Sequence, residues 1–470
     1  MTSEYLNNTS ISGLALGLLV LMVHIGKAQD TYSLPQAIDY ALSHHVEIKV
    51  KELDAENAVW QYREAKSIGV PKVKGNVRYT YFYQKPVSPV TDFLSPAIYG
   101  VLFQEDVIEP RDLGPPNTFE VGFVQNNQLT FGLGVDAMIF DGNYLKGLKA
   151  AKLFMALAEK QVELSQQDII HQVTRAYQNV LVAQRNIEIV DNNISNLNSM
   201  LSEARETYES GFIEELDVDR LQVSLDNLNI EKQKLVQLVD LSKNVLKYQM
   251  AYPLEEDISV SEELETVVEK MILSPITFIE DLDHAKRPEH RLLVDAIELD
   301  EADLVRIKQG YLPTVYASLN YDQLLQRDDL FNGLESGLIP SGSIEIRANI
   351  PIYDGGFTKS RIEQKKIELE KREIELDEFD RAMKLQVNNA FVNFQNAKWT
   401  LERSKEALRL NEKIYNKTQI KYREGVGSSV EVSQAESNLY EAQARYVNAL
   451  YDALTTKTEL DIATGEILER

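Results

Sequence analysis

Four stretches of the chain alternate between apolar and polar side chains. From Ile344 to Ile350, the even positions are apolar and the odd positions carry charged or amide groups. Three other stretches repeat this period, with apolar positions at Val73, Gly75, Val77, Tyr79, Tyr81 and Tyr83; at Leu129, Phe131, Leu133 and Val135; and at Val315, Ala317, Leu319 and Tyr321. A period of two is typical of a strand with one apolar and one wet face. We therefore predict strands over about 72–84, 126–140, 313–323 and 343–353.

Long helices are predicted between these strands. No proline interrupts about 143–208 or 357–422, and each segment allows a helix on the order of 100 Å long. Each is followed by a returning helix, expected over about 216–252 and 429–464. The returning helices carry an apolar seam spaced by three and four residues: Val218, Leu221, Leu225 and Leu228 in the first, and Val432, Ala435, Leu439, Ala442, Tyr446 and Ala449 in the second. This spacing favours an antiparallel coiled coil.

The chain contains two copies of one unit. The turn from Tyr208 to Val218 aligns without a gap with the turn from Tyr422 to Val432. We therefore predict two tandem repeats, over 29–252 and 289–470, joined by an acidic connector over 253–288. In the first repeat, a proline-rich loop is expected from 85 to about 118.

The N-terminus carries an export signal in this interpretation. An apolar run from Ile11 to Ile25 precedes Gly26-Lys27-Ala28, which places small residues where a signal peptidase cuts. The run is shorter than the roughly 20 residues that a membrane-spanning helix needs. We expect a signal peptide over 1–28; the alternative is an uncleaved anchor, since the first ten residues hold Glu4 and no lysine or arginine.

Export changes the interpretation of the strands. An alternating sheet is commonly a soluble one, but strands of about ten residues and the aromatic cluster from Tyr79 to Tyr83 favour an outer-membrane barrel. Four strands cannot close a barrel, and open edges are not tolerated in lipid. Several copies must therefore join their strands into one ring, and a polar inner face makes that ring a pore.

Composition removes several function classes. The 49 lysines and arginines against 73 aspartates and glutamates give a net charge of −24, which argues against nucleic acid as a partner. The absence of cysteine excludes disulfides, thiolate catalysis and cysteine-ligated metals, and six histidines leave little for a transition-metal enzyme. No catalytic set is evident, so we expect neither enzyme activity nor a cofactor.

Three short patterns resemble binding motifs but lack the context that those motifs need. Residues 132–137 match a dinucleotide-binding pattern, yet they lie inside a predicted strand. The pair His44-His45 has no neighbouring metal ligands. The acidic runs at 262–265 and 280–283 lack the glycine and spacing of a calcium loop, so we interpret them as solvated.

The order and duplication of several weak marks resemble the outer-membrane efflux proteins, the TolC family, over nearly the whole mature chain. These marks are Ser33–Leu42, Arg287-Pro288-Glu289, the strand ends at 140–142 and 353–356, and the paired Tyr-x-x-Gly turns at 208 and 422. The resemblance implies a mixed α and β membrane protein: a homotrimer whose four strands per chain close one transmembrane β-barrel, continuous with a long antiparallel α-helical coiled-coil barrel in the periplasm.

The function implied by this resemblance is a passive exit channel in a tripartite efflux or type I secretion system, with outer-membrane lipid around the barrel. Its partners are a periplasmic adaptor (a membrane fusion protein) and an inner-membrane transporter. By resemblance, Gly211-Phe212 and Gly425-Val426 are the helix tips that contact the adaptor. The same glycines also suit turns that need a positive φ. The cargo is not readable from the residues.

A gate at the tips is also implied. In the family, a tyrosine on one tip bonds an aspartate on another, with an arginine nearby. Tyr422 and Asp217 match the first two, whereas Gly427 stands at the arginine position. Carboxylates around a symmetry axis repel one another or bind cations, which makes Glu431 a further candidate; the family's second acid is Gln434 here. An exported coiled-coil structural or adhesive protein of the cell envelope is the alternative function.

Overall fold

The computed structural model describes residues 30–115, 117–273, 282–329 and 337–469. The predicted signal peptide and part of the second acidic run lie outside these ranges. The described residues divide into two compact units, and each unit takes segments from both halves of the chain. The first unit comprises 30–43, 172–273 and 400–455, and the second comprises 44–171, 282–399 and 456–469 apart from the gaps just given.

Two very long helices contribute to both units. α4 runs from Gly142 to Glu209 and α8 from Phe357 to Arg423, with 68 and 67 residues. The returning helices are α5 (Glu215–Met250) and α9 (Ser429–Thr464). All four begin and end within two residues of the bounds expected from the sequence. Among the described helices, none combines the length and apolar character needed to cross a membrane.

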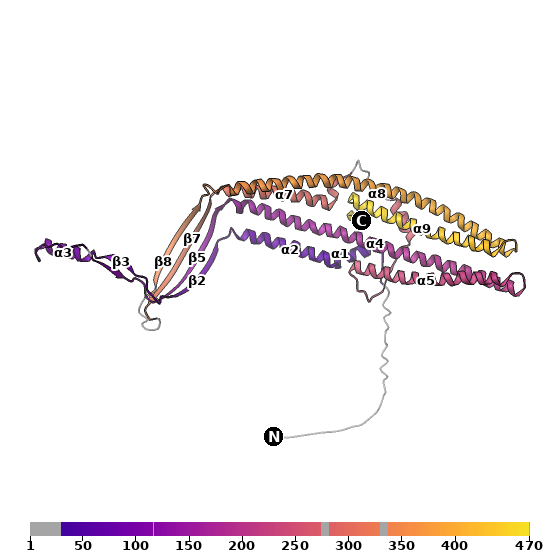
Figure 1. The fold of residues 1–470 in the computed structure, drawn as a ribbon, viewed down its shortest axis with the longest axis horizontal. Coiled ribbons are helices and arrows are strands. Elements are labelled where there is room, and N and C mark those ends of the chain that lie inside the picture. The colour runs from indigo at the N-terminus through magenta and orange to yellow at the C-terminus, as the bar shows by residue number, and fades with distance from the viewer. Residues whose placement is uncertain (1–29, 116, 274–281, 330–336, 470) are drawn as a thin grey trace, which may run out of the picture. The chain divides into compact units, whose positions relative to one another are not determined.

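The second unit contains a four-stranded antiparallel sheet (Figure 1). Its strands are β2 (Lys72–Tyr81), β5 (Asn127–Asp141), β7 (Thr314–Arg327) and β8 (Ile339–Asn349), in the order β2-β5-β7-β8. β8 ends earlier than the expected residue 353, because Pro351 has no N–H with which to continue the ladder. β2 ends at Tyr81 rather than 84, where its partner β5 begins at Asn127.

The register places the alternating positions of all four strands on common faces. One row of paired residues runs Val73, Val135, Leu319 and Ile344, and an adjacent row runs Lys72, Asp136, Ser318 and Glu345. Directly paired residues share a face of an antiparallel sheet. One face is therefore apolar and the other polar, as the period of two predicts. On the polar face, Asp136 accepts hydrogen bonds from Lys74 Nζ at 2.7 Å and Ser318 Oγ at 3.0 Å.

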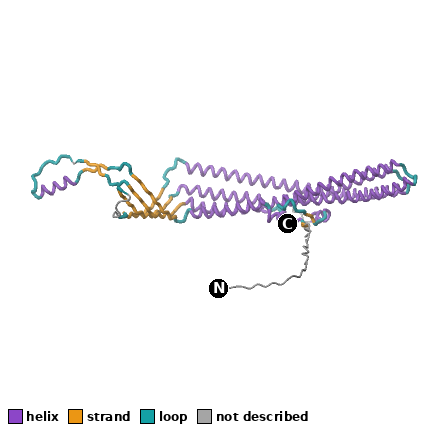
Figure 2. Tube along the Cα trace, turned by 90° about the horizontal axis from the view of Figure 1, so that it is seen from below, coloured by secondary structure: helices purple, strands orange, loops and turns teal. Residues whose placement is uncertain are grey.

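The expected loop from 85 to 118 contains regular structure. β3 (Ser88–Thr91) pairs with β4 (Thr118–Val121), and helix α3 (Leu94–Gln104) lies between them in the chain. In Figure 2 this segment extends away from the four-stranded sheet. α3 begins where Asp92 accepts a hydrogen bond from the Ser95 backbone, one residue before Pro96. The expectation of a loop over the whole of 85–118 was wrong, because a single short helix among prolines has no repeating pattern in the sequence.

The remaining elements are short. The first unit holds a parallel pair of strands, β1 (Asp30–Tyr32) and β6 (Ile258–Val260), together with α6 (Leu264–Leu273). α1 runs over Leu34–His44. The described part of the second unit also holds α2 (Val46–Ser67), α7 (Pro288–Lys308) and the 3-10 turns η2 (His284–Lys286), η3 (Gln309–Tyr311) and η4 (Glu466–Glu469).

The coiled-coil seam forms the core of the first unit. The six predicted seam residues of α9 are all buried, as are Leu221, Leu225 and Leu228 of α5. The three α5 residues and Val432, Ala435 and Leu439 of α9 pack in one cluster with residues of α4 and α8, among them Leu197, Met200, Leu201 and Tyr415. The apolar spacing of the returning helices is thus confirmed as a buried stripe that joins two helical hairpins, α4–α5 and α8–α9.

Candidate functional site: the helix tips

Each helical hairpin turns through a glycine with a positive φ. Gly211 has φ +79° and Gly425 has φ +72°, and a side chain at either position would meet open space. Glycine is therefore required by the backbone conformation rather than by crowding. The turns close through hydrogen bonds from the Gly211 N–H to the Tyr208 carbonyl at 2.8 Å, and from the Gly425 N–H to the Tyr422 carbonyl at 3.0 Å.

The residues that follow these glycines project into solvent. Phe212 is 83% exposed and Val426 is 77% exposed, so the two turns present apolar side chains at the ends of the hairpins. Behind them, a groove of about 510 Å³ is lined by residues of α5 and α9, among them Leu216, Val223 and Val430. An apolar groove beside exposed apolar tips is suited to receive another protein.

Asp217 connects the two hairpins. Its carboxylate accepts a short hydrogen bond from Ser429 Oγ at the start of α9. Arg220, one turn along α5, donates to the same Ser429 Oγ at 3.0 Å and lies 3.7 Å from Asp217 Oδ1. Sequence reasoning missed Arg220 and Ser429, because neither is marked by a motif and they meet only when α5 and α9 lie side by side.

Tyr422 lies close to this group without bonding to it. Its side chain packs against the seam core, and its hydroxyl is buried with no hydrogen-bond partner among the described residues. Burial, followed by the nearby charge of Asp217, raises the pKa of Tyr422. The hydroxyl is therefore neutral and available to an acceptor. Within one chain, Asp217 is engaged by Ser429 rather than by Tyr422.

The backbone at Gly427 is crowded. A Cβ added there would lie 3.2 Å from the backbone nitrogen of Tyr422 and 3.2 Å from Lys421 Cβ. An arginine at this position would therefore require the turn to open slightly. Nearby, Arg423 forms an ion pair with Glu203 of α4 at 2.7 Å, which provides a second tie between the hairpins.

Glu431 lies in the first turn of α9 and is exposed. Its backbone N–H donates to Ser428 Oγ at 3.2 Å, so Ser428 caps the helix. A carboxylate in a first turn is stabilised by the helix dipole. Gln434, one turn further on, donates to Asn438 Oδ1 at 3.2 Å.

The patterns interpreted as accidental have structural roles. Gly132 and Gly134 lie within β5, where an added Cβ would come within 1.9 Å of Asp322 Oδ1 and 2.8 Å of Asn320 Oδ1, so both make room for polar side chains of β7. His45 caps α2 by accepting from the Glu47 N–H at 3.3 Å. The acidic run at 262–265 was wrongly expected to be wholly solvated, since Glu262 accepts from the Leu34 N–H and Glu265 pairs with Arg185 at 2.8 Å.

Known proteins match both the sequence and the fold. The family model "Outer membrane efflux protein" matches residues 119–246 and 296–466. The outer membrane efflux protein BepC of Brucella suis is 21% identical over an alignment that covers 72% of this chain and 72% of BepC. The outer membrane protein TolC of Vibrio cholerae is 22% identical over 74% of this chain and 78% of that protein. A crystal structure of CusC superposes with a TM-score of 0.70 at 14% identity, covering 93% of this chain and 92% of that one.

The fold thus defines a class of membrane channel built from long helices and a β domain. The chain belongs to the outer membrane efflux protein family, the TolC family, and is a protein of the outer membrane.

Proposed function

We propose that three copies of this chain form the outer-membrane exit channel of a tripartite efflux or type I secretion system. The channel is passive, and its helical part extends into the periplasm. The two halves of the chain are tandem repeats, each of which contributes two strands and one helical hairpin to the assembly.

The observation that carries this proposal is the four-stranded sheet. Its apolar face is largely uncovered in the single chain: Val73 is 72% exposed and Ile344 is 79% exposed. Among the described strands, β2 and β8 each pair on one side only. In lipid every backbone group needs a partner, so β8 of one chain must pair with β2 of the next until the ring closes. The polar face, with Asp136 and its partners, then lines the pore.

The helix tips form the periplasmic entrance in this proposal. Asp217, Ser429 and Arg220 hold the two hairpins of a chain together and keep the entrance closed. The ring of Tyr422 packs beside them against the seam core, and its hydroxyl makes no bond among the described residues. Glu431 lies beside this group and sets the charge of the constriction. The adaptor contacts the exposed turns at Gly211-Phe212 and Gly425-Val426, together with the groove behind them.

Native mass spectrometry and planar-bilayer recording of the detergent-purified protein test the proposal together. We expect a trimer that inserts and gives discrete single-channel currents with a low resting open probability. A stable monomer that is released from membranes without detergent would contradict the channel and favour an envelope protein with a coiled coil.

A further inference from the structure

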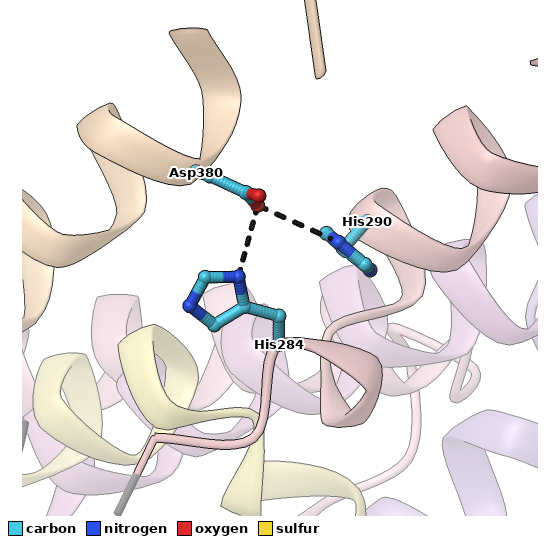
Figure 3. A group of neighbouring side chains, drawn as sticks. All are labelled: His284, His290 and Asp380. Carbon is cyan, nitrogen blue, oxygen red and sulfur yellow. Dashed lines mark hydrogen bonds and ion pairs between the residues drawn. The ribbon is translucent and has the colours of Figure 1, made fainter. Parts of the chain in front are cut away.

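A cluster of two histidines and an aspartate lies in the second unit, away from the helix tips. His284 belongs to η2, His290 to the first turn of α7, and Asp380 to α8 (Figure 3). Asp380 Oδ1 lies 3.0 Å from His284 Nδ1 and 3.5 Å from His290 Nε2. Residues from two segments about 90 positions apart therefore direct three metal-ligating side chains at one point.

The spacing of these atoms matches a tetrahedral metal site. Zinc binds imidazole nitrogen and carboxylate oxygen at about 2.0–2.2 Å, which places neighbouring ligand atoms about 3.3–3.5 Å apart. The 3.5 Å separation of His290 Nε2 from Asp380 Oδ1 agrees with this edge, and the 3.0 Å separation of His284 Nδ1 is slightly shorter. One ligand atom from each of the three residues lies within 4.8 Å of the others. The two imidazole nitrogens lie within 4.8 Å of each other, so rotation of an imidazole would bring them to the tetrahedral edge around a single ion.

The polar groups of the cluster are incompletely satisfied by protein. Both imidazoles approach the same carboxylate oxygen, and only the shorter of the two approaches has hydrogen-bond geometry. All three side chains are partly exposed, so an ion and a completing water molecule have access. The arrangement is therefore open to a ligand that would draw the two histidines and the aspartate together.

The surroundings hold the histidines in place and do not oppose a cation. Arg287, between them in the chain, is buried and clamped by Glu289 at 2.9 Å, so its charge is neutralised. Arg287 also donates to Gln386 of α8 at 3.1 Å and to the Ala463 carbonyl of α9 at 3.3 Å, which fixes the His284–His290 segment against both helices. This segment can thus present two ligands without a further ordering cost.

We propose that His284, His290 and Asp380 bind one divalent transition-metal ion of the zinc type, with water as the fourth ligand. The ion acts as a clasp that joins the end of the acidic connector to α8. This inference goes beyond the channel function and does not depend on it. Hard cations such as Mg²⁺ are excluded by the two imidazole ligands, because Mg²⁺ prefers an octahedral shell of oxygen.

Zinc titration of the chelator-treated, detergent-purified full chain, carrying no polyhistidine tag, tests this site. We expect one tightly bound Zn²⁺ per chain, a visible d–d spectrum of tetrahedral type when Co²⁺ is bound instead, and a Zn²⁺-dependent rise in Tm. His290→Gln and Asp380→Asn should each weaken Zn²⁺ binding by more than about 100-fold, since even the outer-shell partners of metal ligands contribute 10–100-fold. Both should abolish the rise in Tm.

The paired substitution His44→Gln and His45→Gln is the matched control, because it removes two adjacent histidines and leaves the cluster intact; it should bind Zn²⁺ like the parent. Asp380→Asn preserves an acceptor for His284, and circular dichroism without metal should show an unchanged helical fold. Failure of the parent to bind Zn²⁺ at micromolar concentrations, or equal binding by the parent and the Asp380→Asn variant, would overturn the metal site. Neither result would test the proposed channel function, which does not depend on this metal site.

Discussion

The carboxylate of Asp217 accepts from Ser429 on the other hairpin, and Arg220 supports both partners. A hydrogen bond to a charged group contributes roughly 1.5–3 kcal/mol. In a trimer this bond is present three times. Together, three such bonds are strong enough to favour the closed state of an entrance. They are also weak enough for the binding energy of a docking partner to overcome.

Asp217→Ala should therefore raise the resting conductance and the open probability in planar bilayers without lowering the yield of trimer. Tyr422→Phe is the matched control, because it removes a hydroxyl that has no hydrogen-bond partner in the part of the chain that the structure describes. The double variant should behave like Asp217→Ala alone. If Tyr422→Phe opens the channel as much as Asp217→Ala does, Tyr422 bonds an acceptor on a neighbouring chain and the tie between α5 and α9 is secondary.

Glu436 is a buried residue whose negative charge lowers the stability of the folded chain. It is 3% exposed in the seam region of α9, and burial raises its pKa even though Tyr440 donates to it at 2.6 Å. A raised folded-state pKa means that stability is full at low pH and is lost as the pH rises through that value. Each unit of pKa elevation is equivalent to about 1.4 kcal/mol at neutral pH.

Glu436→Gln should accordingly raise Tm at pH 7 and change it little near pH 4, as measured by circular dichroism. Gln keeps an oxygen for the Tyr440 hydroxyl, so the hydrogen bond survives while the buried charge is removed. Glu441→Gln, an exposed position one turn further along α9, serves as the control and should leave Tm nearly unchanged at both values. An equal effect at pH 4 and pH 7 would exclude charge burial as the cause.

At the level of elements, the two faces of β8 should respond differently to substitution. Ile346 lies on the apolar face, paired with Ala317, whereas Arg347 lies on the polar face and bonds Glu345 at 2.6 Å. Ile346→Arg should cost about 2–4 kcal/mol near the bilayer midplane and reduce assembly in membranes. Arg347→Ala should leave assembly intact and alter conductance. Equal loss of assembly in both variants would show that the faces are assigned wrongly.

The sequence predicts elements well where a periodic pattern runs for many residues. Seam residues such as Leu439 and the alternating positions around Ile346 are identified because burial itself imposes their spacing. The ends of β2 and β8 are less predictable, since they depend on where a partner strand begins and on Pro351. α3 was missed because a single short apolar helix among prolines has no repeating pattern.

The candidate sites were predictable only in part. The tip glycines follow from the duplicated turn, because a positive φ requires glycine in each copy. The bonds of Asp217 to Ser429 and of His284 to Asp380 join residues 212 and 96 positions apart. No local pattern specifies such contacts, because they are created by the packing of helices that are distant in the chain.

At the level of the whole molecule, the stability of the sheet should depend on protein concentration. If β2 and β8 find partners only in other chains, the folded sheet and the trimer form in one step, and dilution favours dissociation. We expect the apparent Tm of the sheet, followed by the gel mobility of heated samples, to fall on dilution in detergent. The helical hairpins, whose seam core lies within one chain, should show a smaller shift. A Tm independent of concentration would indicate a sheet that is stable alone.

The two open edges of the sheet also have a consequence for biogenesis. Before assembly, the chain carries an uncovered apolar face in water, and β2 and β8 each have one edge that no other described strand pairs. Such edges pair readily with any extended chain nearby. The interval between export and assembly is therefore the stage at which this protein is most vulnerable to aggregation. The order of events therefore matters as well as the final stability: the strands need to be shielded until neighbouring chains pair with them.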